Sequence, residues 1–247
     1  MPASEKPIAG LSAVFSRKRY KPRSKRIKTK GVFDRCESAQ PPGMETTALF
    51  AAAFLLGGIP FGFLAGRFYG VDVREVGSGN IGATNVLRSV GKLPGVVTLI
   101  LDIAKGLGPV IVGFNLGGAR LAAGAGVSAV LGHVFCPYLG FRGGKGVATA
   151  AGAVAGLAPI AFGLALASFL AGLAVFRKVG LASSIAAVAL PVVVMLNDRA
   201  VEVQGSAWAV SAVVLIRHTS HLKGLLLGQV SPPSDLDPSR GLPDGGH

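Results

Sequence analysis

The 247-residue sequence is 50% hydrophobic and only 15% charged, with a net charge of +13 and a mean hydropathy of +0.55. These values exclude an ordinary soluble globular domain, because apolar stretches of bilayer-spanning length account for them. Two isolated cysteines, Cys36 and Cys136, exclude a disulfide framework and a cysteine metal site. The 36 glycines favour helices that pack closely in lipid. We therefore predict one membrane domain.

The first 43 residues form a separate basic segment, with 11 Lys or Arg residues against three acids. The run from Arg17 to Lys30 could bind anionic lipid or nucleic acid. We interpret residues 1–43 instead as a solvated, disordered extension with no nucleic-acid partner. The segment lacks the apolar core and cleavage site of a signal peptide. Since Met44 directly precedes an apolar run, we expect translation to begin there; N-terminal mass analysis that finds residues 1–43 intact would refute this.

The rest of the chain alternates apolar stretches with short polar connections. The apolar stretches are residues 46–66, 93–116, 119–136, 147–176, 179–196 and 205–216. The first, third and fourth connections are basic, whereas the second holds only Arg120 and the fifth holds Asp198, Arg199 and Glu202. Basic connections stay in the cytoplasm. This sorting works if the chain crosses the bilayer an even number of times between Lys145 and Arg177.

The stretch 147–176 decides the number of helices. Its 30 residues are too many for one untilted span and rather few for two full ones at about 1.5 Å rise per residue. We predict two short helices that enter and leave one face, with a turn near Pro159. The fold class is then an all-α integral membrane protein of about seven helices, roughly five full spans plus two short or half-spanning helices. This domain covers residues 44–228, begins outside and ends inside, and precedes a disordered tail at 229–247.

The first basic connection contains the glycine-rich segment EVGSGNIGATNVLR, residues 75–88. Its glycines free the backbone to turn N–H groups toward an anion, its polar side chains add neutral donors, and one arginine adds a charge. These residues are Gly77, Gly79 and Gly82, then Ser78, Asn80, Thr84 and Asn85, and finally Arg88. The spacing GxGxxG is present, but no strand or βαβ unit precedes it, which argues against dinucleotide binding. We predict a phosphate cradle, with a tight polar connection as the alternative.

The third connection contains GHVFCPYLGFRGGKG, residues 132–146. Gly143, Gly144 and Gly146 bracket Lys145, so its ammonium lies beside exposed backbone donors, as the neutralisation of a phosphate requires. The segment is not a Walker A loop, because GxxxxGK followed by Ser or Thr is absent. For His133, near a membrane boundary, we expect a structural hydrogen bond at a helix end rather than catalysis.

A third polar segment, LIRHTSHLK at residues 215–223, follows the last span. Its basic and imidazole groups, Arg217, His218 and His221, can simply anchor the helix at the interface. Because three anion-suited segments converge on one predicted face, we favour a phosphate site. Inside the second span, Asp102 and Lys105 lie one turn apart, and we expect a buried structural ion pair there.

In order and spacing, EVGSGNIGATNVLRSVGK, GHVFCPYLGFRGGKGVAT and IRHTSHLKGLLLG resemble the three signature motifs of the acyl-phosphate-dependent glycerol-3-phosphate acyltransferases, the PlsY type of bacteria. The resemblance covers residues 48–228, and the third motif matches least. It implies a multi-pass enzyme of the bacterial inner membrane, with its active site facing the cytoplasm. The implied reaction transfers an acyl group from acyl phosphate to glycerol 3-phosphate, giving 1-acylglycerol 3-phosphate and phosphate in phospholipid synthesis. The resemblance implies no cofactor and no metal.

The same resemblance implies roles for individual residues. The expected catalytic residues are Ser78, Arg88, Lys145 and His218. The expected substrate- or phosphate-binding residues are Gly77, Gly79, Asn80, Gly82, Thr84, Asn85, His133, Arg142, Gly143, Gly144, Ser183, Arg217 and His221. In this scheme Ser78 and Arg88 bind glycerol 3-phosphate, with Asn80 and Asn85 shaping the site. Thr84, Lys145 and Ser183 hold the phosphate of the acyl phosphate. His218 positions substrate.

This chemistry needs an oxyanion hole, charge neutralisation of the leaving phosphate and only a weak base, because acyl phosphate is already activated. The resemblance implies that the acceptor's own phosphate takes the proton. The HxxxxD class of acyltransferases is excluded, since Tyr138, Lys223 and Leu226 occupy the fifth positions after the three candidate histidines.

Three residues depart from the family pattern: His221 stands where Asn is usual, Gly224 where a second Arg or Lys is usual, and Gly180 where Ser is common. These changes leave a catalytically lapsed paralogue as one alternative. A small anion or phosphate channel or transporter is another, because broken helices and glycine-rich loops also suit that task. Acyl-chain preference and oligomeric state are open at this point.

Overall fold

A computed structural model of the chain describes residues 43–197 and 200–219, and this part contains helices and connections without a strand. The elements are α2 (Met44–Gly58), α3 (Phe61–Phe68), α4 (Ala83–Ser89), α5 (Lys92–Val134), the 3₁₀ turn η1 (Pro137–Leu139), α6 (Val147–Leu157), α7 (Pro159–Phe176), α8 (Val179–Asn197) and α9 (Val201–Ile216). The predictions for residues 1–42, for the C-terminal tail and for His221 and Gly224 fall outside the described residues.

The first predicted span is interrupted. Helix α2 ends at Gly58, and α3 begins at Phe61 after Ile59 and Pro60. Proline lacks a backbone N–H and its ring clashes with the preceding helical turn, so the apolar stretch 46–66 does not form one continuous helix. Together, α2 and α3 still form a stretch of 25 residues that is long and apolar enough to cross a membrane.

Helix α5 is a hairpin of two helical limbs, which confirms the predicted spans at 93–116 and 119–136. Its turn consists of Gly117 and Gly118, whose backbone angles are non-helical. The two limbs approach closely beside this turn, because a Cβ added at Gly113 would lie 2.6 Å from the Cα of Ala122. Glycine therefore permits both the reversal and the contact between the limbs.

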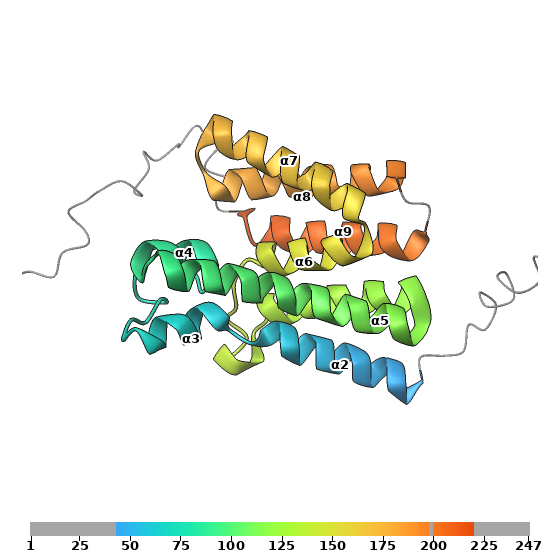
Figure 1. The fold of residues 1–247 in the computed structure, drawn as a ribbon, viewed down its shortest axis with the longest axis horizontal. Coiled ribbons are helices and arrows are strands. Elements are labelled where there is room, and N and C mark those ends of the chain that lie inside the picture. The colour runs from blue at the N-terminus through green and yellow to red at the C-terminus, as the bar shows by residue number, and fades with distance from the viewer. Residues whose placement is uncertain (1–42, 198–199, 220–247) are drawn as a thin grey trace, which may run out of the picture. The chain divides into compact units, whose positions relative to one another are not determined.

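The predicted hairpin at 147–176 is confirmed, with the reversal at Ala158 and Pro159 as the first residue of α7. In Figure 1, α6 runs away from the end of the bundle that carries α4, and α7 returns toward that end. The two helices are unequal, however: α6 has 11 residues, whereas α7 has 18 and is long enough to cross a membrane. The prediction that both are short is wrong for α7.

Four described stretches are long and apolar enough to span a membrane, and one of them contains both limbs of α5. Counting α2 with α3 as one interrupted span and α5 as two limbs, the described residues hold seven apolar helical segments. The two shorter segments are α6 and α9. Helix α9 begins at Val201, earlier than predicted, so Glu202 lies in its first turn rather than in a connection. An acidic side chain is favourable at that position because it faces the positive end of the helix dipole.

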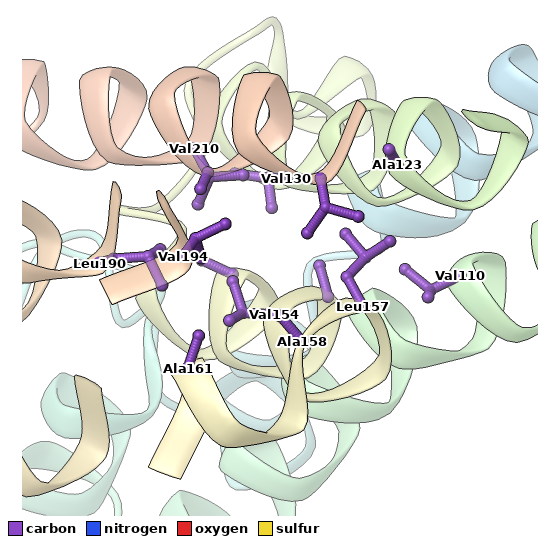
Figure 2. Close-up of a cluster of buried hydrophobic side chains, with 14 of the residues drawn as sticks. Val110, Ala123, Val130, Val154, Leu157, Ala158, Ala161, Leu190, Val194 and Val210 are labelled. Carbon is purple, nitrogen blue, oxygen red and sulfur yellow. The ribbon is translucent and has the colours of Figure 1, made fainter. Parts of the chain in front are cut away.

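Small and branched side chains form the core between α5, α6, α8 and α9. Figure 2 shows this cluster, which includes Val110, Val130, Val154, Leu157, Leu190, Val194 and Val210. Glycines bring neighbouring backbones into contact: a Cβ at Gly57 in α2 would lie 2.6 Å from the Cα of Ala129 in α5 and closer still to its carbonyl oxygen. Close backbone approach of this kind replaces the hydrophobic drive between helices in lipid.

Candidate active site

The connection between α3 and α4 is held in shape by Asn85, whose side chain is buried. Its amide nitrogen donates to the carbonyls of Val73 at 2.8 Å and Val76 at 3.1 Å, and its amide oxygen accepts the N–H of Ser78 at 2.9 Å. Gly77 has a φ of +60°, in the left-handed region that favours glycine. Asn85 therefore uses both amide donors to shape the loop, the role that the resemblance implied, and not as a donor to an anion, as its residue type had suggested.

Apolar packing anchors the same loop to the rest of the site. Val73, Ile81 and Val86 are buried together, and Leu139 of η1 packs against them. The loop before α6, which begins with η1, is therefore in contact with the loop before α4. Ser78, Thr84 and Arg88 lie on the exposed side of this assembly.

At the start of the α3–α4 loop, Arg74 donates to Asp72 through both its backbone and its side chain, with an ion-pair distance of 2.6 Å. These hydrogen bonds lower the pKa of Asp72 from 3.8 to about 2. The acid is thus charged and occupied by Arg74 at neutral pH. The amide oxygen of Asn80 accepts the N–H of Gly82 at 3.2 Å and shapes the turn into α4.

The loop before α6 folds back onto the end of α5. The N–H of Gly143 donates to the carbonyl of Val134, and the N–H of Gly144 donates to the carbonyl of His133, both at 3.1 Å. A Cβ at Gly143 would lie 2.6 Å from the oxygen of Val134, so only glycine fits. Lys145 and Gly146 then lead directly into α6, whose first N–H groups have no partner within the helix.

Arg217, at the end of α9, reaches this loop. Its Nε donates to the carbonyl of Gly144 at 3.3 Å and its Nη2 donates to that of Gly143 at 3.1 Å. Burial lowers the pKa of Lys145, and the nearby positive charge of Arg217 lowers it further. An anion beside the two cations would relieve their repulsion. The sequence had suggested a phosphate-binding role for Arg217, with membrane anchoring as the alternative, and contained no signal for this contact.

The three predicted segments therefore meet at one end of the helical bundle (Figure 1). Leu139 joins the second segment to the first, and Arg217 joins the third to the second. Exposed donors, two cations and a helix N-terminus gather there, which is an arrangement suited to phosphate groups. No group of three or more His, Cys, Asp or Glu side chains arranged for a metal ion occurs among the described residues.

A profile of the family described as glycerol-3-phosphate acyltransferase matches residues 47–228. This chain belongs to the glycerol-3-phosphate acyltransferase family. The glycerol-3-phosphate acyltransferase of Trichlorobacter lovleyi is 45% identical over 189 residues, which cover 75% of this chain and 97% of the relative. That of Aquifex aeolicus is 39% identical over 191 residues, 75% of this chain and 98% of the relative.

Solved structures agree with this membership in the acyltransferase family. The chain is similar to the crystal structure of PlsY (YgiH), an integral membrane glycerol 3-phosphate acyltransferase, in its glycerol 3-phosphate form. The TM-score is 0.72 at 36% sequence identity, over 75% of this chain and 94% of that chain. The lysophosphatidic acid form of the same enzyme gives a TM-score of 0.71 at 35% identity. The protein is accordingly a multi-pass membrane acyltransferase.

Two further residues that the acyltransferase resemblance implicated are buried, and the side chain of each contacts a backbone carbonyl one turn earlier in the chain. The Nδ1 of His218 lies 2.7 Å from the carbonyl of Val214 in α9. The hydroxyl of Ser183 donates to the carbonyl of Val179, one turn earlier in α8, at 2.9 Å. The hydroxyl of Ser183 thus has a partner within its own helix. The phosphate contact expected of Ser183 stays a prediction. Arg142 is exposed in the loop before α6.

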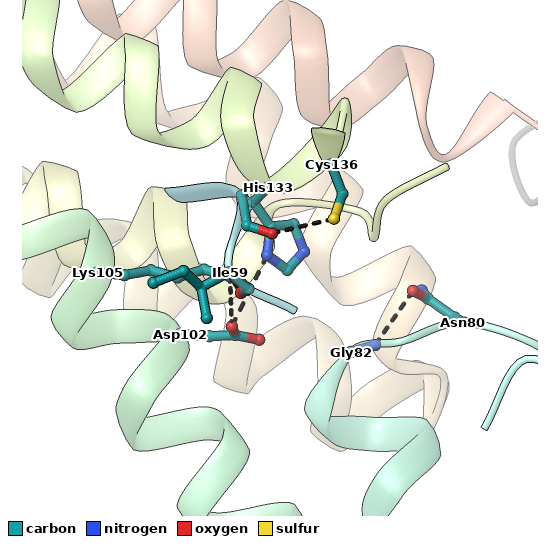
Figure 3. A network of polar contacts seen from close by, with 8 residues as sticks. Ile59, Asn80, Gly82, Asp102, Lys105, His133 and Cys136 are labelled. Atoms are coloured by element: carbon teal, nitrogen blue, oxygen red, sulfur yellow. Dashed lines mark hydrogen bonds and ion pairs between the residues drawn. The ribbon is translucent and has the colours of Figure 1, made fainter. Parts of the chain in front are cut away.

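A buried polar cluster lies behind the acyltransferase site (Figure 3). The predicted ion pair is confirmed: Lys105 and Asp102 are 2.8 Å apart, with 2% and 3% of their side chains exposed. Lys105 also donates to the carbonyl of Ile59 at 2.7 Å, where α2 and α3 are interrupted. The Sγ of Cys136 donates to the carbonyl of Gly58 at 3.0 Å. Side chains thus satisfy carbonyls that the helix break leaves without helical partners.

The histidine at the end of α5 differs from expectation. His133 is buried, but its Nδ1 has no hydrogen-bond partner among the described residues and lies 3.8 Å from the Oδ1 of Asp102. The structural hydrogen bond at the helix end is made by the backbone carbonyl of His133, which accepts from Gly144, and not by Nδ1 of the imidazole. The other edge of the ring faces Gly144.

Proposed function

We propose that this protein transfers an acyl group from acyl phosphate to glycerol 3-phosphate, forming 1-acylglycerol 3-phosphate and inorganic phosphate. A glycerol hydroxyl attacks the acyl carbonyl, a new C–O ester bond forms, and the C–O bond to phosphate breaks. The hydroxyl proton passes to the phosphate of the acceptor. The observation that carries the proposal is the loop before α6, where Lys145 stands at a helix N-terminus and Arg217 contacts the paired glycines.

In this scheme the leaving phosphate lies beside Lys145 and the first N–H groups of α6. A positive charge and oriented N–H groups stabilise the negative charge that develops on the leaving phosphate more than they stabilise the bound acyl phosphate, which lowers the barrier. Arg217 holds the loop carbonyls away from the anion, because those carbonyls accept its N–H groups. Thr84, on the exposed face of α4, is the proposed neutral donor.

Glycerol 3-phosphate is proposed to lie on the loop before α4, with its phosphate toward Arg88. Ser78 is held at the exposed surface of that loop by the hydrogen bond from its N–H to Asn85. This fixed position supports a role for its hydroxyl in orienting the acceptor, since orientation alone accounts for much of the rate in transfer between two bound substrates. The solved relative in its glycerol 3-phosphate form supports this choice of acceptor.

We further propose that the protein lies in the bacterial inner membrane, with its active site on the cytoplasmic side. The site end of the described bundle is strongly basic. The turn of α5 and the start of α9 lie at the other end (Figure 1), and Arg120 and Glu202 of these two segments line one cavity. The basic residues at the site end are Arg67, Arg74, Arg88, Lys92, Arg142, Lys145, Arg177, Lys178 and Arg217. Positive charges in short loops stay in the cytoplasm. In a Cys36→Ser, Cys136→Ser background, maleimide should label Ser78→Cys from the cytoplasmic side and Arg120→Cys from the other; labelling of both from one side would refute the orientation.

The reaction is tested by measuring phosphate release from palmitoyl phosphate with and without glycerol 3-phosphate. Purified wild-type protein should release phosphate only with the acceptor, and Lys145→Ala should lose this release. Arg120→Ala is the matched control, because it removes a cation from the opposite end and should leave the rate unchanged. If the wild-type protein releases no phosphate under varied lipid conditions, or if Lys145→Ala retains the wild-type rate, the proposal is wrong.

A further inference from the structure

The buried cluster behind the site connects the middle of α5 to the phosphate loop. Asp102 lies in the first limb of α5, His133 lies near the end of the second limb, and Figure 3 shows both side chains directed toward each other beside Ile59. The Oδ1 of Asp102 is 2.8 Å from the Nζ of Lys105 and 3.8 Å from the Nδ1 of His133. One carboxylate oxygen therefore faces both groups.

Lys105 is held from several sides, which fixes the carboxylate of Asp102. Its Nζ donates to the carbonyl of Ile59 at 2.7 Å and lies 5.4 Å from the centre of the Phe61 ring. The interrupted segment between α2 and α3 is thus tied to α5 through Lys105. Asp102 has little freedom to turn away from His133, because it pairs with an immobilised cation in a position that is almost fully buried.

His133 is in contact with the phosphate loop on its other side. A Cβ at Gly144 would lie 3.1 Å from the Cε1 of the imidazole and closer still to its Nε2. The backbone carbonyl of His133 accepts the N–H of Gly144 at 3.1 Å. The imidazole ring therefore packs directly against Gly144. Lys145 is the next residue in the chain. Arg217 holds the same loop through its two carbonyls.

The Nδ1 of His133 is a buried side-chain nitrogen without a hydrogen-bond partner among the described residues, in a side chain that is only 4% exposed. A buried polar nitrogen is unfavourable when it is unpaired, and the carboxylate of Asp102 is the acceptor that it faces. A proton on Nδ1 directed at that carboxylate would fix both the tautomer and the tilt of the ring.

We propose that Asp102 and His133 are positioning residues for acyl-phosphate binding, acting through Gly144 on Lys145. Asp102 orients the imidazole of His133, and the imidazole fixes the position of Gly144. The position of Gly144 in turn determines where Lys145 and the first N–H groups of α6 contact the phosphate. The inference rests on the proposed function, because it assigns the pocket of Lys145 to the acyl-phosphate donor.

The test compares Asp102→Asn, His133→Ala and the double variant with the wild-type protein in the phosphate-release assay, varying each substrate in turn. Either single change should raise the KM for palmitoyl phosphate by roughly 10-fold to 100-fold, as loss of a supporting contact or a displacement of about 1 Å does. The KM for glycerol 3-phosphate should stay within about twofold, since its site lies on the other loop. The double variant should be no worse than the more impaired single variant, because both changes interrupt one path.

Thr98→Val is the matched control. Thr98 is equally buried in the first limb of α5, and its hydroxyl donates only to the carbonyl of Pro94 in the same helix. Its two KM values should equal those of the wild-type protein.

A fall in maximal rate with both KM values unchanged would mean that the cluster only supports folding, and additive effects in the double variant would mean that the two residues act separately. Either result overturns the inference. If His133→Ala does not fold, competitive inhibition of Asp102→Asn by inorganic phosphate decides: weaker inhibition than in wild type is expected, and equal inhibition refutes the path. Failure of the proposed function is distinct, since the wild-type protein itself would then show no acceptor-dependent release.

Discussion

Replacing Gly143 with alanine tests whether the phosphate loop must fold back onto α5. The added Cβ would lie 2.6 Å from the oxygen of Val134 and closer still to that of His133, whereas ordinary contact begins at 3.4 Å. Both obstacles are backbone atoms and cannot swing aside, so the loop must move by at least 0.8 Å, the difference between those two distances. The hydrogen bond from Arg217 to the Gly143 carbonyl moves with it.

Displacement of a catalytic group by about 1 Å lowers the rate by roughly 100-fold. This corresponds to about 2.7 kcal/mol of transition-state stabilisation at about 1.36 kcal/mol per tenfold. We therefore expect kcat/KM for palmitoyl phosphate to fall by that factor in Gly143→Ala, measured by acceptor-dependent phosphate release. Gly163→Ala is the control, because nothing lies within 4 Å of a Cβ at that position in α7. If folded Gly143→Ala keeps its kcat/KM within about threefold of wild type, the displacement argument is wrong.

Three further predictions follow from the described contacts. Arg88→Ala should raise the KM for glycerol 3-phosphate by roughly 10-fold to 100-fold, the effect of losing a hydrogen bond to a charged group; an equal rise for acyl phosphate would contradict the proposed division of the site. Because burial and Arg217 lower the pKa of Lys145 below its ordinary 10.5, acyl-phosphate affinity should be full below that lowered pKa and weaken as pH rises through it. Lys145→Arg should abolish this alkaline loss, since guanidinium stays charged, and a KM profile identical to wild type would refute the assignment. Gly132→Val should lower the thermal unfolding temperature in detergent, by a destabilisation of about 1 to 3 kcal/mol, because its Cβ would collide with the backbone of α2; Gly108→Val, with open space around it, should not.

The sequence by itself determined most of the helical architecture. Hydropathy is a local property of the sequence, and so is the tendency of glycine and proline to interrupt a helix. The turn at Gly117 and Gly118 and the hairpin at Pro159 were therefore predictable. It also located the three polar segments of the site. Boundaries within apolar runs were less secure. Pro60 favours a break in the first run, but the carbonyls that the break frees are satisfied by side chains from elsewhere in the chain. The start of α9 likewise depends on packing against neighbouring helices.

Only the tertiary structure decided how the site is held together. Arg217 contacts Gly143 and Gly144 across more than 70 residues of chain, and Lys105 contacts Ile59 across 46. In each case the acceptor is a backbone carbonyl, which every residue possesses and no sequence pattern marks. The individual contacts of Asn85 and His133 were hidden for the same reason, because the type of a polar residue does not reveal which atoms it will contact. Those atoms are the ones that the fold brings within hydrogen-bond distance.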